Sequence, residues 1–82
     1  PGADAAIERK QSAELLYRML DELPDERRDL FVLVELEEMS VPDAAAVLGL
    51  NVNTAYSRLR DARHDFEQAV TRERAREDWR GR

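Results

Sequence analysis

The segment from Ser40 to Arg63, SVPDAAAVLGLNVNTAYSRLRDAR, constrains the fold of this chain more than any other stretch. A short run typical of a helix ends at Gly49, a three-residue turn follows, and a second helix opens near Asn53 and Thr54. This order is typical of a helix-turn-helix, whose second helix enters the major groove of DNA. The segment therefore predicts a nucleic-acid-binding module.

The size and composition of the chain favour one small helical domain. It has 82 residues, of which 43% are hydrophobic, with only three glycines and three prolines for turns. No stretch of useful length alternates apolar and polar residues as a strand does. We therefore expect a single all-α domain over residues 1–82.

Several classes of protein are disfavoured by what the sequence lacks. There is no cysteine, so a disulfide scaffold and a thiolate metal site are excluded, and a reducing cytoplasm fits. No apolar run approaches the ~18 residues of a membrane span, and no signal peptide is visible. We expect a cytoplasmic protein without a membrane partner. Since the chain begins at Pro1-Gly2 rather than with Met, we also expect it to be one domain of a longer protein.

The charge is unevenly distributed along the chain. The formal net charge is -5, with -7 in residues 1–50 and +2 in residues 51–82, where eight arginines face six acids. A basic half of only +2 gives a weak electrostatic field. We expect the isolated domain to bind nucleic acid weakly.

Apolar spacing and capping residues predict four helices. Pro24 suits the first turn of a helix, and Ser40 is a good N-cap with Asp43 three residues later. Asn53 is assigned as the N-cap of the last helix. Residues 1–12 are expected to be a frayed end or linker, and residues 72–82 a charged tail. The helices are predicted at Asp4–Asp21, at Pro24–Glu38, at Val41–Leu48 and from the residue after Asn53 onward.

The last helix is predicted to have two distinct faces. Its inward stripe is Ala55, Leu59, Ala62, Phe66 and Val70. Its outward stripe is Tyr56, Ser57, Arg60, Asp61 and His64.

The run from Leu23 to Arg63 resembles region 4 of sigma-70-type RNA polymerase sigma factors, closest to the extracytoplasmic-function group. The resemblance rests on Leu23-Pro24 with Arg28 four residues later, on the apolar second helix that ends in ELE, and on the segment from Ser40 to Gly49. It also rests on Thr54 followed by SRL and AR. The resemblance implies an all-α, four-helix domain with a C-terminal helix-turn-helix of winged-helix-like or sigma4 type and a long last helix.

The resemblance also implies a function and partners. It implies recognition of the -35 element of promoter DNA, docking on the β flap of the RNA polymerase core, and sequestration by an anti-sigma factor. The promoter-contacting face corresponds to Asn53, Thr54, Tyr56, Ser57, Arg60 and Asp61, flanked by Arg58 and Arg63. The family commonly has basic residues at the positions of Tyr56 and Asp61, so this face carries less positive charge than usual.

Each of these residues also has a structural interpretation. Arg60 and Arg63 either contact phosphates or guanine, or pair with Asp61 or Glu67 on their own helix. Arg58 either contacts a phosphate or forms a salt bridge with an acid of the second or third helix. Asp61 either accepts a hydrogen bond from cytosine or orders a neighbouring side chain. The apolar residues of the first helix are either core or a groove for a polymerase or anti-sigma helix: Leu15, Leu16, Met19 and Leu20.

No residue pattern predicts catalysis. His64 and Glu67 share a face, but a metal site needs more ligands, and none converge on them by spacing. There is no nucleophile with a partnered base and no phosphate-binding loop. We expect neither an enzyme nor a metal, cofactor or small-molecule substrate. Two alternatives remain: a LuxR-type response-regulator DNA-binding domain, and a sigma4-like helical interaction module with little DNA binding.

Overall fold

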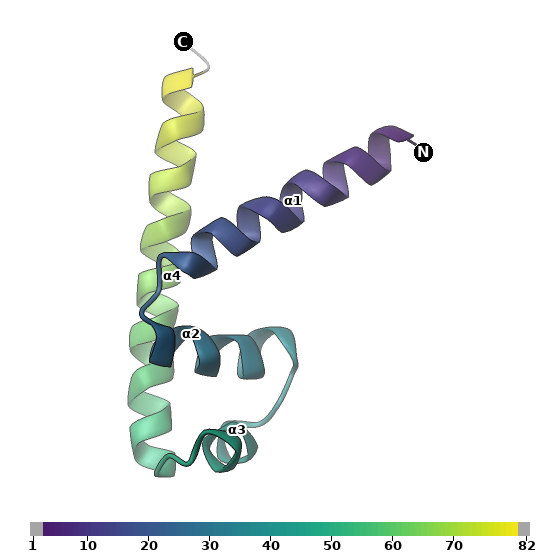
Figure 1. Cartoon of the computed structure of the whole chain (residues 1–82). Coiled ribbons are helices and arrows are strands. Elements are labelled where there is room, and N and C mark those ends of the chain that lie inside the picture. The colour runs from purple at the N-terminus through teal and green to yellow at the C-terminus, as the bar shows by residue number, and fades with distance from the viewer. Residues whose placement is uncertain (1–2, 81–82) are drawn as a thin grey trace.

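The computed structural model describes residues 3–80 and is helical almost throughout (Figure 1). Its elements are α1 (Ala3–Asp21), α2 (Asp25–Phe31), the π-helix η1 (Val32–Leu36), α3 (Val41–Leu48) and α4 (Val52–Arg80). Within this part of the chain there is no strand, so the expected all-α class is confirmed. The sigma4-type form, which has no β-wing, is the one seen. The predictions for Pro1-Gly2 and for the last two residues of the tail concern positions outside the described residues.

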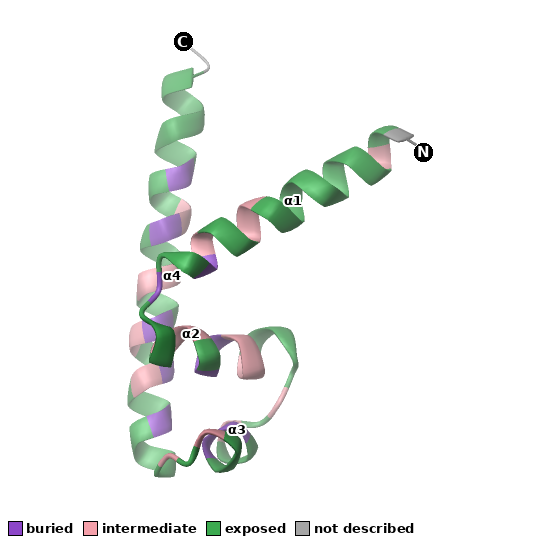
Figure 2. Ribbon diagram, in the orientation of Figure 1, coloured by how far each residue is buried: buried purple, intermediate pink, exposed green. Residues whose placement is uncertain are grey.

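Helix α4 is the spine of the domain, and the other helices pack along one side of it (Figure 1). Near its start, one core cluster joins Leu30 of α2, Ala44 and Ala45 of α3, and Ala55 and Leu59 of α4. The small alanines allow α3 and α4 to approach closely, as a helix-turn-helix requires. The purple bands on one side of the ribbon in Figure 2 follow this buried seam along α4.

A second core cluster lies further along α4, where α1 ends and α2 begins. It contains Leu20, Leu23, Phe31 and Ala62, with the ring of Phe66 stacked on Phe31 at a centroid distance of 4.8 Å. Burial of large apolar side chains contributes roughly 1.5–3 kcal/mol each, so this cluster fixes α1 and α2 onto the spine.

The corner between α1 and α2 is closed by Arg28. Its Nε donates to the carbonyl oxygen of Leu20 at 2.9 Å, and its Nη2 donates to that of Leu23 at 2.9 Å. These carbonyls lie at the carboxyl end of α1, where backbone acceptors lack helical partners and the dipole favours a cation. Arg28 therefore caps α1 from the next helix.

The second helix differs from its predicted course, Pro24–Glu38. Pro24 is the N-cap, and the α-helical part ends at Phe31, after which the backbone widens into η1. The amide of Glu37 donates to Val32 at 2.9 Å, and the amide of Met39 donates to Leu33 at 3.0 Å. The chain leaves the helix through Glu38, which has a left-handed φ of 60°. Apolar periodicity does not reveal this wider turn, because a five-residue segment that is apolar almost all round looks the same whether its backbone bonds run from i to i+4 or from i to i+5.

The third helix and the turn after it agree with the prediction. The Oγ of Ser40 accepts a hydrogen bond from the amide of Asp43 at 3.2 Å, and α3 spans Val41–Leu48 as expected. Gly49 has a left-handed φ of 68°, and the amide of Leu50 donates to Ala45 at 2.8 Å. This is a Schellman-type helix end, for which glycine is the favoured residue.

Both ends of α4 correct the prediction. Asn51, not Asn53, is the cap: its Oδ1 accepts the amide hydrogen of Asn53 at 2.8 Å, so the helix starts at Val52. At the other end, the residues set apart as a charged tail continue the helix as far as Arg80. The inward stripe also shifts, because Ala69 and Glu73 are buried while Val70 is only half-buried. A 3.6-residue period moves the buried line off a strict spacing of four over this length.

Candidate nucleic-acid interface

The outward face of α4 lies over the first three turns of the helix. We call Asn53, Thr54, Tyr56, Ser57 and Arg60 the polar face. All five residues are exposed, with 54% of Tyr56 accessible. Successive residues turn by about 100° around a helix, which places Asn53, Ser57 and Arg60 opposite the buried stripe of Ala55, Leu59 and Ala62. Thr54 and Tyr56, the sequence neighbours of Ala55, lie on the two sides of this stripe. Burial therefore confirms the predicted inward and outward positions in this part of the helix, except that Asp61 is only half-exposed.

The start of α4 also presents backbone donors. The turn after Gly49 leaves the first amides of the helix at the exposed end, and the amide of Asn53 is satisfied by Asn51. Because Asn51 takes the capping role, Asn53 lies exposed in the first helical turn. A helix N-terminus of this kind attracts phosphate through its amides and dipole.

Two arginines at the edges of the polar face are paired with acids of the preceding elements. Arg58 pairs with Glu26 of α2 at 3.4 Å, which is the salt-bridge alternative expected for it. The Nε of Arg63 donates to Glu35 of η1 at 2.6 Å, and not to Asp61 or Glu67 of its own helix, which was the structural alternative considered for it. Exposed ion pairs contribute only about 0–1 kcal/mol, so phosphate oxygens can compete for both guanidinium groups.

Arg60 is the most accessible arginine of this region. Its side chain is 76% exposed, and its nearest acid is Asp61, at 3.5 Å on the same helix. Asp61 also lies 3.9 Å from Arg27 of α2, and within residues 3–80 it forms no ion pair with Arg58 or His64. The ordering role considered for Asp61 therefore concerns Arg27 and Arg60 instead.

Arg27 anchors α2 to the middle of α4. Its Nη1 donates to Asp65 at 2.6 Å, and this hydrogen bond, helped by the charge of Asp65, raises the pKa of Arg27 above its ordinary value. This contact ties the carboxylate of Asp65 to α2. The acids close to the polar face are thus partly neutralised by arginines of the protein itself.

The polar face carries groups that are suited to binding. Hydroxyls, an amide, a phenol and the largely exposed guanidinium of Arg60 are groups that read phosphates and base edges. Within residues 3–80 no group of three or more histidine, aspartate or glutamate side chains is placed to hold a metal ion. In the same part of the chain, no helix is long and apolar enough to cross a membrane.

The sequence did not single out Glu26 and Glu35, which modulate this face, or Val47 and Val52, which extend it. Val47 of α3 is 63% exposed and Val52 is 39% exposed. Their signal was weak: a valine near the end of one predicted helix and a valine in the turn before the next have no special spacing, and a charged pair 28 residues apart leaves no periodic trace.

The apolar residues of α1 divide into two groups. Leu20 is 3% exposed and belongs to the second core cluster, so it is not free to meet a partner. Leu15, Leu16 and Met19 are half-buried. They leave part of an apolar surface open on α1.

Together, the fold and the polar face define a helix-turn-helix protein. A family model described as Sigma-70, region 4 matches residues 13–65. The chain belongs to this family, as its resemblance predicted. The family is one of DNA-binding regulatory domains rather than of enzymes, and its domains act with DNA and RNA polymerase. Among curated proteins, none matches the chain. The family match favours the sigma-factor interpretation over the LuxR-type alternative.

Proposed function

We propose that this domain recognises the -35 element of promoters for an alternative sigma factor of the extracytoplasmic-function group. The observation that carries the proposal is the exposure of the whole polar face at the start of α4, opposite a buried apolar stripe. In this account α4 enters the major groove with its first turns against the base edges.

Each residue of the polar face is assigned the DNA contact that suits its chemistry. Thr54, Ser57 and the first amides of α4 contact phosphate oxygens and set the register. Arg60 reads guanine through its forked guanidinium, and Tyr56 packs on a thymine methyl. Asn53 contacts the duplex from the first turn. Asp61 accepts from cytosine or weakens binding at mismatched sites.

Arg58 and Arg63, the arginines that flank the polar face, contact DNA only after they release their acidic partners. Arg58 and Arg63 exchange Glu26 and Glu35 for phosphate oxygens, at a cost of roughly 1 kcal/mol or less per pair. The free domain therefore binds DNA weakly, and the polymerase supplies most of the net affinity of the complex.

The polymerase and anti-sigma surfaces belong to the same proposal. Leu15 and Met19 of α1, together with the accessible part of Leu16, form an apolar strip that receives a helix of the β flap, or an anti-sigma factor in its place. Leu16 also packs against the second core cluster, so it contributes less to this strip. Leu20 is left out of this surface because it is buried. The domain acts in the cytoplasm, where promoters and polymerase are found.

The experiment is a binding titration of labelled duplexes that carry candidate -35 sequences. Arg60→Ala is expected to weaken binding about tenfold, which corresponds to the loss of one base-reading contact. Arg74→Ala is the matched control: it removes the same charge from an exposed position four turns further along α4. Equal losses in the two variants would contradict the proposal.

One observation favours the interaction-module alternative. Both flanking arginines are already occupied by acids of the same chain, and the formal net charge is -5. If Arg60→Ala leaves both duplex binding and transcription from a responsive promoter unchanged, the module is an interaction domain.

A further inference from the structure

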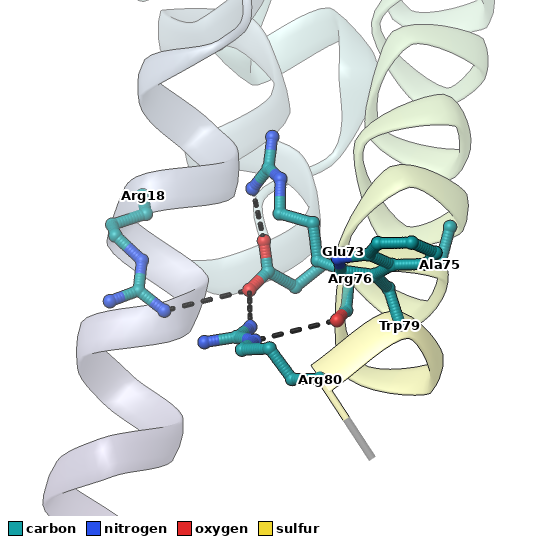
Figure 3. Close-up of a pocket in the computed structure, with 6 residues that line it drawn as sticks. All are labelled: Arg18, Glu73, Ala75, Arg76, Trp79 and Arg80. Carbon is teal, nitrogen blue, oxygen red and sulfur yellow. Dashed lines mark hydrogen bonds and ion pairs between the residues drawn. The ribbon is translucent and has the colours of Figure 1, made fainter. Parts of the chain in front are cut away.

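A cluster of arginines lies between α1 and the carboxyl-terminal half of α4 (Figure 3). It is well separated along α4 from the polar face at the start of that helix. Glu73 is buried there, with 9% of its side chain exposed. Its carboxylate accepts from the Nη1 of Arg76 at 2.6 Å and pairs with Arg18 at 3.7 Å and Arg80 at 3.6 Å. We call these four residues the Glu73 cluster.

The Glu73 cluster has more positive charge than the fold requires. One carboxylate is balanced by one guanidinium, yet three converge on it, from two helices. The side chains of Arg18, Arg76 and Arg80 remain 67%, 56% and 66% exposed. Each guanidinium has five donors, and Glu73 takes only part of them. The Nε of Arg80 also donates to the carbonyl oxygen of Arg76 at 3.4 Å, so donors of all three exposed guanidinium groups remain for a further acceptor.

A hollow and an aromatic side chain lie beside these arginines. The cluster lines an open cavity of about 600 Å³ together with Ala75 and Trp79. Trp79 is 76% exposed, the highest value among the exposed large hydrophobic side chains described. Tryptophan and arginine are the residue types that most often dominate the energy of protein interfaces.

We propose that this cavity binds an acidic segment of a partner protein, which places carboxylates on Arg18 and Arg80 and an apolar side chain on Trp79. The excess positive charge selects the carboxylates, because carboxylates match the forked donors of arginine. The site contrasts with the rest of the chain, which is acidic overall, so it also orients an acidic partner toward this end of the molecule.

The position of the cluster favours a protein over a nucleic acid. Arg76 follows Thr54 by 22 residues in one continuous helix, so it lies about 33 Å further along the axis. A major groove is only about 8.5 Å deep. When the start of α4 is in the groove, the cluster is therefore beyond the duplex; this step alone rests on the proposed function.

The chain carries its own reporter for a test, because Trp79 is the single tryptophan. The probe is a synthetic peptide of repeated Glu-Glu-Leu, and its control is the same peptide with glutamine in place of every glutamate. The glutamate peptide is expected to change Trp79 emission saturably, and the glutamine peptide is not. A similar response to both peptides, or to neither, would overturn the proposal.

Substitutions then locate the peptide. Arg18→Gln and Arg80→Gln are each expected to weaken binding about fivefold, the effect of losing one exposed ion pair. Arg74→Gln, on another side of the same helix, is expected to leave it unchanged. If Arg74→Gln weakens binding as much as Arg18→Gln and Arg80→Gln do, the peptide responds to the overall charge of the helix and not to a defined site. That result would show the proposal to be wrong.

Glu73→Gln supplies a variant whose expected effect is a gain. It removes the internal competitor for the three guanidinium groups, so the glutamate peptide should bind more tightly, which a folding defect cannot mimic. Helical circular dichroism confirms the fold of each variant. Unchanged or weaker binding by a folded Glu73→Gln variant would contradict the proposal.

The same emission signal tests two other possible ligands of the cavity, duplex DNA and a second copy of the chain. A duplex that changes Trp79 emission as strongly as the glutamate peptide would make this a phosphate site, and a change on concentrating the chain alone would make it a self-association surface. Either result overturns the proposal. Arg60→Ala should alter duplex binding only, and Arg18→Gln peptide binding only, so failure of one proposal is distinct from failure of the other.

Discussion

Glu35 is the residue that most directly limits the charge available to DNA. Its Oε1 accepts the Nε of Arg63 at 2.6 Å and holds that guanidinium at the edge of the polar face. We predict that Glu35→Gln raises affinity for duplex DNA severalfold and steepens the salt dependence by about one phosphate contact. Glu37→Gln, which removes the same charge from a neighbouring exposed position, is the control for the general change in field. If both variants raise affinity equally, pairing with Arg63 is not the cause.

Glu38 carries the one left-handed backbone conformation of a non-glycine residue among residues 3–80. Its φ of 60° follows from the exit of the chain out of η1. Glycine adopts this region without the steric cost that a Cβ brings. We predict that Glu38→Gly raises the free energy of unfolding by roughly 0.5–1 kcal/mol, measured by urea denaturation.

The matched test of Glu38 is Gly49→Ala. Gly49 has a nearly equal φ of 68°, and a Cβ added there meets no atom within 4 Å. Any loss of stability in that variant therefore reports backbone strain alone. A loss for Gly49→Ala together with a gain for Glu38→Gly is expected; changes of the same sign would contradict the strain argument.

At the scale of elements, α4 keeps its orientation through the residue that faces both α2 and α3. Leu59 is 2% exposed and belongs to the first core cluster with Leu30 and Ala55. We predict that Leu59→Ala lowers the free energy of unfolding by about 2–5 kcal/mol, because it leaves a cavity at the junction of three helices. Thermal unfolding followed by circular dichroism measures the loss.

The control for Leu59 is a leucine outside that junction. Leu36 of η1 is 43% exposed, so Leu36→Ala should change the stability by less than about 1 kcal/mol. Similar losses in both variants would show that the helix-turn-helix is not organised around the Leu30, Ala55 and Leu59 contact.

The connection between α1 and α2 also depends on a single side chain. Arg28 donates to the backbone carbonyls of Leu20 and Leu23, each at 2.9 Å. We predict that Arg28→Ala destabilises the domain by roughly 1–2 kcal/mol, since it removes a charged cap from the end of α1. Arg9→Ala, in the exposed first half of α1, should be neutral in the same denaturation experiment.

At the scale of the whole molecule, local signals explain which parts of the fold were predictable. Ser40 and Gly49 bound α3 through contacts within a few residues of each, and both were identified from the sequence. The start of α4 was placed two residues late because Asn51 and Asn53 are equally good caps by type. Choosing between them requires the turn geometry, which sequence spacing does not contain.

The rest depends on contacts between distant segments. The pair of Arg63 with Glu35 and the pair of Arg18 with Glu73 join residues of different helices, and neither has a period or a motif. From its sequence, the charged end of the chain is predicted to be a solvated tail. In the structure, α1 crosses this segment and buries Glu73. The polar face was predictable because its pattern lies within one helix, whereas the acids that neutralise its edges were not.

The charge of the whole domain predicts a shallow salt dependence for DNA binding. Arg60 is assigned to guanine, so only Arg58 and Arg63, after release from their acids, neutralise phosphates, at most about two in all. The slope of log affinity against log salt is about -0.9 per phosphate, so we expect a slope no steeper than about -2. A titration of the 82-residue chain over a range of salt measures it. A slope near -6 would require basic contacts that this face does not contain.

The central claim is that the start of α4, with its polar side outward, is the surface that meets duplex DNA. The most direct test is to follow the amide resonances of the chain by nuclear magnetic resonance while a promoter duplex is added. The account predicts the largest shifts at Asn53, Tyr56, Ser57 and Arg60, with little change beyond Ala69 on the same helix. Shifts concentrated at the Glu73 cluster or on α1, with the polar face unchanged, would contradict it.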